Sequence, residues 1–112
     1  MTSSRKGLTM TQLEGVISVK REKGIEVLLM DDIPLVKLFT SYNGKNLVLT
    51  IESKSSACSF QGEAEIFYFE GQQQFHRGIK YVYDFIIDEI DMVEVFEKLQ
   101  GQKVSITVEV EG

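Results

Sequence analysis

Nucleophilic catalysis by this chain would need Cys58 or a serine beside a base. Cys58 is the only cysteine and His76 is the only histidine. A catalytic thiol needs a base within hydrogen-bond reach, and no local signature links these two positions. One cysteine and one histidine do not supply the ligand set of a zinc site, and a single cysteine excludes an internal disulfide. We therefore predict a protein that is not an enzyme and that has no cofactor.

Carboxylates gather at two places, and they are the remaining candidates for chemistry. Asp31 and Asp32 precede one expected helix, and Asp88 and Glu89 precede another. Oxygen ligands of this kind suit Ca²⁺ or Mg²⁺, so these four residues are candidate metal ligands. Helix capping by Asp32 and favourable placement of negative charge at a helix N-terminus explain the same residues. Capping is the favoured interpretation, because no calcium-loop spacing is present.

The acidic pairs belong to an internal repeat. Leu28–Ser53 aligns with Phe85–Val110 at an offset of 57 residues without a gap, and seven of the 26 positions are identical. An internal repeat decides the architecture of a fold, because each copy forms one structural unit. The identical positions are Asp31/Asp88, Ile33/Ile90, Val36/Val93, Phe39/Phe96, Gly44/Gly101, Thr50/Thr107 and Glu52/Glu109.

Each copy of the repeat predicts a helix followed by a strand. Apolar residues at spacing i, i+3, i+4, i+7 form one helix face in each copy: Leu35, Leu38, Phe39 and Tyr42, then Met92, Val95, Phe96 and Leu99. Gly44 and Gly101 stand where a helix ends in a left-handed residue. Strict apolar alternation after each glycine predicts a half-buried strand. A hairpin precedes each helix, with a short turn at Glu22–Gly24 and a longer loop at Gly71–Gly78.

These elements predict an α+β protein built from a duplicated β-β-α-β unit. Residues 10–53 and 63–112 form the two repeats of a single domain, a turn-rich connector spans 54–62, and 1–9 is a flexible tail or a mis-called start. A unit of about 50 residues is too small to bury its own apolar face, whereas two copies can cover each other. We expect one pseudo-twofold barrel or two-layer sandwich with two short helices. Two separate mini-domains are the alternative.

In element order, each half resembles the hairpin–helix–strand unit of swapped-hairpin transcription regulators. The resemblance covers the order of elements and the Ile33-Pro34 pair after the first hairpin. Those regulators bind DNA through arginine-rich surfaces, whereas this chain has acids on its expected outer helix faces. DNA binding is therefore not expected, because function belongs to the site and not to the fold.

Charge and hydropathy restrict the possible partners. Twelve Lys and Arg are scattered among seventeen Asp and Glu, which gives a net charge of −5. Nucleic-acid binding needs clustered basic residues. No apolar run approaches the roughly 20 residues of a membrane span, and the N-terminus has no signal-peptide core. We expect a cytoplasmic protein whose partner is itself or another protein, with no nucleic acid and no membrane.

The second hairpin, Glu63–Ile87, is the predicted interface. Alternation sends Phe67 and Phe69 to one face of its first strand and Ile66 and Tyr68 to the other. A strand that is apolar on both faces is either enclosed within the domain or covered by something else.

We predict a non-enzymatic binding or assembly module that forms a homo-oligomer through this hairpin and its long loop. Tyrosine is favoured at protein contacts, and long loops often display function. The candidate partner-binding residues are Phe75, His76, Arg77, Tyr81 and Tyr83. The alternative is a small-ligand or divalent-cation domain with a pseudo-symmetric site at the two helix N-termini.

Overall fold

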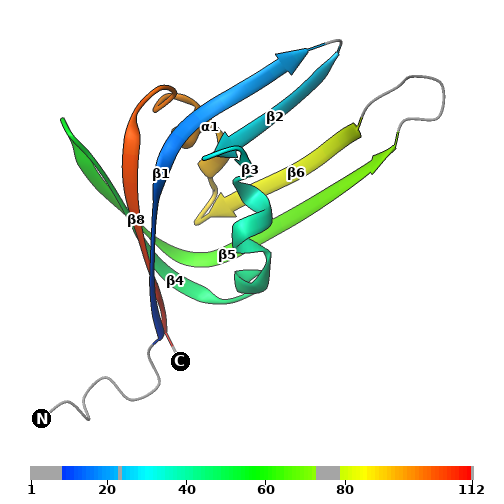
Figure 1. Cartoon of the computed structure of the whole chain (residues 1–112). Coiled ribbons are helices and arrows are strands. Elements are labelled where there is room, and N and C mark those ends of the chain that lie inside the picture. The colour runs from blue at the N-terminus through cyan, green and yellow to red at the C-terminus, as the bar shows by residue number, and fades with distance from the viewer. Residues whose placement is uncertain (1–8, 23, 73–78, 112) are drawn as a thin grey trace, which may run out of the picture.

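The computed structural model describes residues 9–22, 24–72 and 79–111. Strands dominate it, with two short helices among them (Figure 1). In chain order the elements are β1 (Thr9–Glu22), β2 (Ile25–Met30), β3 (Ile33–Pro34), the 3₁₀ helix η2 (Val36–Tyr42), β4 (Asn46–Ser53), β5 (Ala57–Gln72), β6 (Ile79–Ile87), β7 (Ile90–Asp91), α1 (Met92–Glu97) and β8 (Lys103–Val110). The α+β class predicted from the sequence is therefore confirmed at this level.

All strand pairings are antiparallel, and their order is β3-β2-β1-β8-β4-β5-β6-β7. At the centre β4 pairs with β8, and Thr50 lies opposite Thr107. Over the described residues the order ends at β3 and β7, two strands of two residues each. The sheet is therefore not closed into the barrel that the sequence had suggested.

Two long strands bend from the central sheet into lateral hairpins. β1 pairs with β8 from Thr9 to Val16 and then with β2 from Ile17 onward. β5 pairs with β4 up to Glu63 and with β6 from Ala64 onward. We call the β1–β2 hairpin the first arm and the β5–β6 hairpin the second arm. Figure 1 shows both arms extending the same way from the central strands.

The course of β5 corrects the expected connector. Residues 54–62 were predicted to be a turn-rich link, but from Ala57 onward they are strand paired with β4. Ser59 takes part in this pairing, because its hydroxyl lies 2.9 Å from the hydroxyl of Thr50, the residue opposite it on β4, and hydrogen-bonded Thr–Ser pairs stabilise a sheet.

The acidic pairs form tight turns and do not cap helices, so the predicted capping role of Asp32 is wrong. Met30 pairs with Ile33, and the two residues between them, Asp31 and Asp32, have φ of 50° and 68°. Two left-handed residues in a two-residue hairpin loop are the mark of a type I′ turn. Asp31 also fixes the bend of β1, because its Oδ1 accepts a hydrogen bond from the backbone N–H of Val16 at 2.9 Å.

Asp88 and Glu89 form the matching turn in the second half. They lie between the paired residues Ile87 and Ile90, with φ of 49° and 67°. The residue that caps α1 is Asp91, whose carboxylate accepts a hydrogen bond from the Val93 backbone N–H at 3.0 Å.

The two helices lie where the repeat predicted them and bury the predicted faces. Phe39 of η2 and Phe96 of α1 are fully buried. The first helix is a 3₁₀ helix whose N-cap, Leu35, has no side-chain cap. Pro34, immediately before it, offers neither an N–H nor a capping oxygen. Gly44 and Gly101 each follow with φ of 83°, as predicted.

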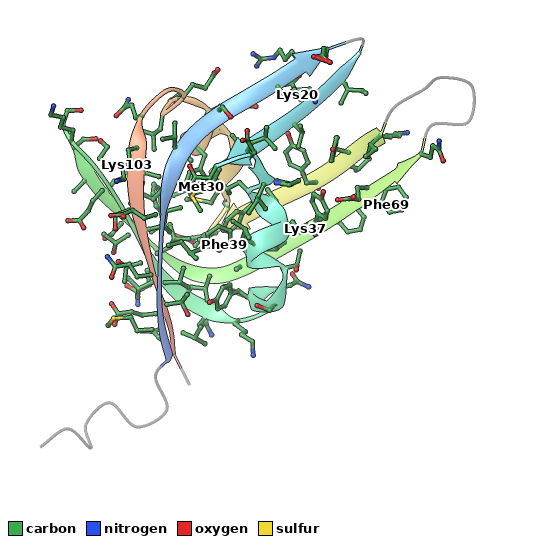
Figure 2. All side chains as sticks on the ribbon, in the orientation of Figure 1. Lys20, Met30, Lys37, Phe39, Phe69 and Lys103 are labelled. Atoms are coloured by element: carbon green, nitrogen blue, oxygen red, sulfur yellow. The ribbon has the colours of Figure 1, made fainter. Side chains whose placement is uncertain are left out.

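One apolar core joins the elements. Its centre is an aromatic group in which the Phe85 ring lies 5.2 Å from the Phe39 ring and 6.3 Å from the Phe96 ring, measured between centroids. Thus η2, β6 and α1 share a single interior (Figure 2). No polar or charged residue is buried among the described residues. In that same portion of the chain, none of the helices has the length and apolar character needed to cross a membrane.

Candidate functional site

The second arm has two faces of different character. Register pairs Phe69 with Val82 and Phe67 with Asp84, so these side chains share one face, while Tyr68 and Tyr83 form a pair on the other. The face with Tyr68 and Tyr83 also carries the buried Phe85 and Ile66, so we call it the inner face. The opposite one is the outer face.

Tyr83 of the inner face holds the two arms together. Its hydroxyl oxygen accepts a hydrogen bond from the backbone N–H of Leu28 on β2, at 3.1 Å. Burial raises the pKa of Tyr83 above its usual value of 10.0, because a low-dielectric environment disfavours the phenolate. The ring is half-buried and belongs to the fold of this chain.

Tyr68 of the inner face is also engaged within the chain. Its hydroxyl donates to the carboxylate of Glu70 at 2.5 Å, and that carboxylate lies 3.7 Å from the ammonium of Lys37 on η2. Burial first, and then the hydrogen bond to Glu70, raise the pKa of Tyr68. The inner face is therefore occupied by internal contacts.

The outer face exposes three large apolar side chains. Phe67 is 53% exposed, Phe69 51% and Val82 41%. We call these three residues the outer patch. Phe69 lies along its own strand, so that a side chain at Gly71 would collide with its ring at 2.8 Å; the ring thereby covers a glycine that offers no side chain of its own. Figure 2 shows Phe69 on β5, in the second arm.

A surface hollow adjoins the outer patch on the side nearer the central sheet. It has a volume of about 310 Å³ and is lined by Asn43, Glu65, Ile66, Phe67, Asp84 and Ile86. Glu65 and Asp84 are exposed carboxylates on the outer face. Within the described part of the chain, neither has a Lys or Arg at ion-pair distance.

The first arm offers a comparison with the same strand geometry. In the first arm, Lys20↔Val27 is the third residue pair after Ile17↔Met30. In the second arm, Phe67↔Asp84 is likewise the third residue pair after Ala64↔Ile87. Lys20 and Glu22 thus stand on the first arm where Phe67 and Phe69 stand on the second, and both are exposed. This hairpin therefore folds with charges at those positions.

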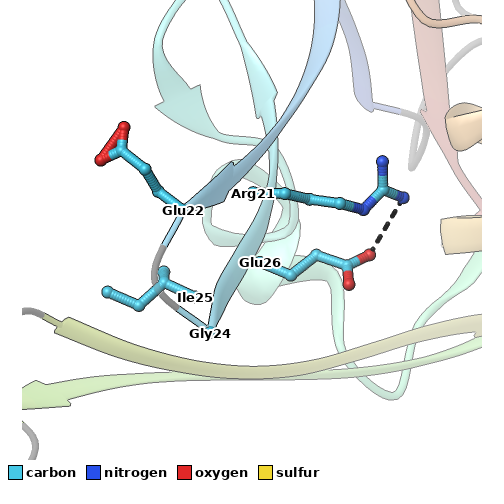
Figure 3. A pocket seen from close by; sticks show the side chains of 5 residues that line it. All are labelled: Arg21, Glu22, Gly24, Ile25 and Glu26. Atoms are coloured by element: carbon cyan, nitrogen blue, oxygen red, sulfur yellow. Dashed lines mark hydrogen bonds and ion pairs between the residues drawn. The ribbon is translucent and has the colours of Figure 1, made fainter.

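The hollow near the turn of the first arm contains an ion pair formed within the chain. It measures about 350 Å³ and is lined by Arg21, Glu22, Gly24, Ile25 and Glu26. There the guanidinium of Arg21 lies 3.3 Å from the Glu26 carboxylate (Figure 3). The hollow beside Glu65 and Asp84 lacks such an internal cation among the described residues.

The structure brings together only some of the partner-binding residues predicted from the sequence. Phe75, His76 and Arg77 lie outside the described residues. Tyr81 and Tyr83 are half-buried on the inner face, with Tyr83 bonded to Leu28. Sequence reasoning did not single out the outer patch. The sequence signal that could have identified the patch is the alternation that separates Phe67 and Phe69 from Ile66 and Tyr68. Only one of these two faces can meet the core, so the other is exposed.

The candidate metal ligands stand in turns. Asp31 and Asp32 precede β3, and Asp88 and Glu89 precede β7, so neither pair lies in the first turn of a helix. One carboxylate oxygen of Asp31 is engaged by the Val16 backbone. Over the ranges 9–22, 24–72 and 79–111, no group of three His, Cys, Asp or Glu side chains is placed to hold a metal ion. Cys58 is exposed on β5.

Comparison with known proteins found no matching family model, no matching curated protein and no matching solved structure.

Proposed function

We propose that this protein is a non-enzymatic binding module that contacts a protein partner through the outer patch of its second arm. The observation that carries the proposal is the exposure of Phe67 and Phe69, each more than half open to solvent on neighbouring outward positions of β5. Exposed apolar residues scattered singly are ordinary, but a contiguous group is typical of an interaction site.

The energetics favour coverage of this patch. Full burial of a phenylalanine side chain contributes about 1.5–3 kcal/mol, so covering the open halves of two rings contributes roughly half of that for each. Phenylalanine is also among the residue types enriched in the buried core of protein interfaces. Val82, directly opposite Phe69, extends the apolar surface onto β6. A few rings that bury into a partner are enough to anchor an interface.

Comparison with the first arm indicates that the outer patch is not needed for folding. Lys20 and Glu22 occupy the corresponding positions there and remain exposed. Because a hairpin of the same register accepts two charges, the phenylalanines of the second arm need another explanation. Binding supplies one.

We also propose that the chain is an internal duplication. The first and second arms are then equivalent parts of its two copies. The pairs Met30↔Ile33 and Ile87↔Ile90 lie 57 residues apart, as do Leu29↔Pro34 and Ile86↔Asp91. The four left-handed turn residues have φ of 50° and 68° in one half and 49° and 67° in the other. Equal registers and equal backbone angles at the repeat spacing support the proposal.

Site-specific photo-crosslinking in the cells that make the protein tests the binding function. Benzoylphenylalanine replaces Phe69 in one variant and Lys20 in a matched control on the first arm. We expect a discrete crosslinked product from position 69 and none from position 20. Its mass tells a second copy, as in the predicted homo-oligomer, from a different protein. Absence of a product at both positions, or equal labelling at both, contradicts the proposal.

A further inference from the structure

We propose that the partner inserts an arginine or lysine side chain into the hollow between Glu65 and Asp84 while apolar side chains of the same segment cover the outer patch. This inference rests on the proposed function, because it assigns a chemical class to the partner of that surface. Its basis is the sign and position of the charges around the patch.

The two carboxylates are close neighbours, and among the described residues neither has a basic side chain at ion-pair distance. Asp84 lies opposite Phe67 and Glu65 lies opposite Ile86, so the two acids are diagonal neighbours on one face. Diagonal positions across a strand pair are about 7–8 Å apart, within reach of one another. Like charges so placed repel. A single cation between them removes the repulsion and pairs with both, and a guanidinium can present donors to two acceptors at once.

The lining of the hollow suits the rest of a basic side chain. Phe67 and Ile86 supply apolar walls beside the two carboxylates. Long basic side chains bury their methylene stems against apolar surface while the charged head stays near polar groups. A cation held beside the Phe67 ring also gains attraction from its π-face. The volume of about 310 Å³ leaves room for such a side chain.

A second copy of the chain is a poorer match for this surface. Its own outer face would bring another Glu65 and Asp84, with Lys80 as the cation on the same face of β6. Among the described residues, the two outer faces would then contribute four carboxylates and two ammonium groups. The net charge of −5 on each chain adds repulsion between copies. A basic partner meets complementary charge both at the hollow and at longer range.

Two synthetic peptides probe the assignment with the full-length protein. One alternates leucine and arginine over eight residues, and the other alternates leucine and glutamate. Backbone amide NMR shifts locate binding, and fluorescence anisotropy measures affinity. The test variant is Glu65→Gln with Asp84→Asn. The control is Glu52→Gln with Glu94→Gln, which changes the net charge equally at exposed positions on β4 and α1.

We expect the arginine peptide to shift the amides of Phe67, Val82 and Ile86. We expect the Glu65→Gln/Asp84→Asn variant to bind it about five- to tenfold more weakly, the range for two partly exposed ion pairs. The control variant should bind as the unmodified protein does.

Four results would overturn the inference. One is equal weakening in the control variant, and another is equal binding of the glutamate peptide. The third is a failure of the patch amides to shift with the arginine peptide at about 1 mM. A dimer in sedimentation that Phe67→Lys with Phe69→Glu dissociates would also overturn it, because the occupant is then a second copy. That last result would support the proposed function, which the crosslinking experiment at position 69 tests independently.

Discussion

The hydroxyl of Tyr83 on β6 accepts a hydrogen bond from the backbone N–H of Leu28 on β2, at 3.1 Å. These two strands are far apart in the order of the sheet and are not paired with each other. The bond therefore joins the two arms where strand pairing does not. It also commits the inner face of the second arm to the fold, whereas Phe67, Phe69 and Val82 of the outer face stay exposed.

Removing that hydroxyl should weaken the protein. Tyr83→Phe leaves the N–H of Leu28 without its acceptor in a part-buried position. The expected loss is about 1–2 kcal/mol in the free energy of unfolding, because an unsatisfied donor keeps its desolvation cost. Urea denaturation measures it. Tyr81→Phe, a neighbour on the same face, is the control, and an equal loss there would show that the bond to Leu28 is not the cause.

Alkaline pH should destabilise the protein through its inner-face tyrosines. Burial raises the pKa of Tyr83, and burial with the Glu70 contact raises that of Tyr68, above the ordinary 10.0. The stability that these two tyrosines contribute is complete below pH 10. It is lost as the pH rises from there toward their pKa values in the folded protein, because the unfolded chain releases phenolic protons more readily. Ultraviolet titration of the folded protein should show tyrosines ionising later than in the urea-unfolded chain. Coincident titration curves would refute this prediction.

Replacing the turn residue Glu89 by glycine should stabilise the protein. Its φ of 67° is a left-handed conformation that costs an L-residue roughly 1–2 kcal/mol and glycine little. We expect Glu89→Gly to raise the free energy of unfolding by about 1 kcal/mol. Glu94→Gly within α1 should instead lower it by about 1 kcal/mol. Thermal unfolding compares the two, and a loss of stability in Glu89→Gly would show that this side chain makes a contact that outweighs the strain.

The sequence predicted the elements of the repeat better than their connections. The faces of both helices, marked by Phe39 and Phe96, followed from their spacing, because that spacing depends only on the geometry of the helix itself. The turns did not. An Asp-Asp pair before an apolar run suits an N-cap and a left-handed turn equally well, and only the pairing of Met30 with Ile33 decides between them.

The candidate site was predictable in place but not in orientation. Alternation in β5 separates Phe67 from Tyr68 in sequence, yet it does not say which of the two meets the core. That choice depends on Phe39, which packs on Phe85 and so draws the tyrosine face inward. The contact joins residues 46 positions apart in the chain, and no local pattern contains it.

The most direct test of the account exchanges the outer patch for the residues of the first arm. The variant Phe67→Lys with Phe69→Glu copies Lys20 and Glu22 onto the second arm. If the patch exists for binding, the free energy of unfolding in urea should stay within about 0.5 kcal/mol of the unmodified protein, as for ordinary surface substitutions. A loss of about 3 kcal/mol or more, the magnitude of core phenylalanine truncation, would show that these rings hold the fold together and would contradict the account.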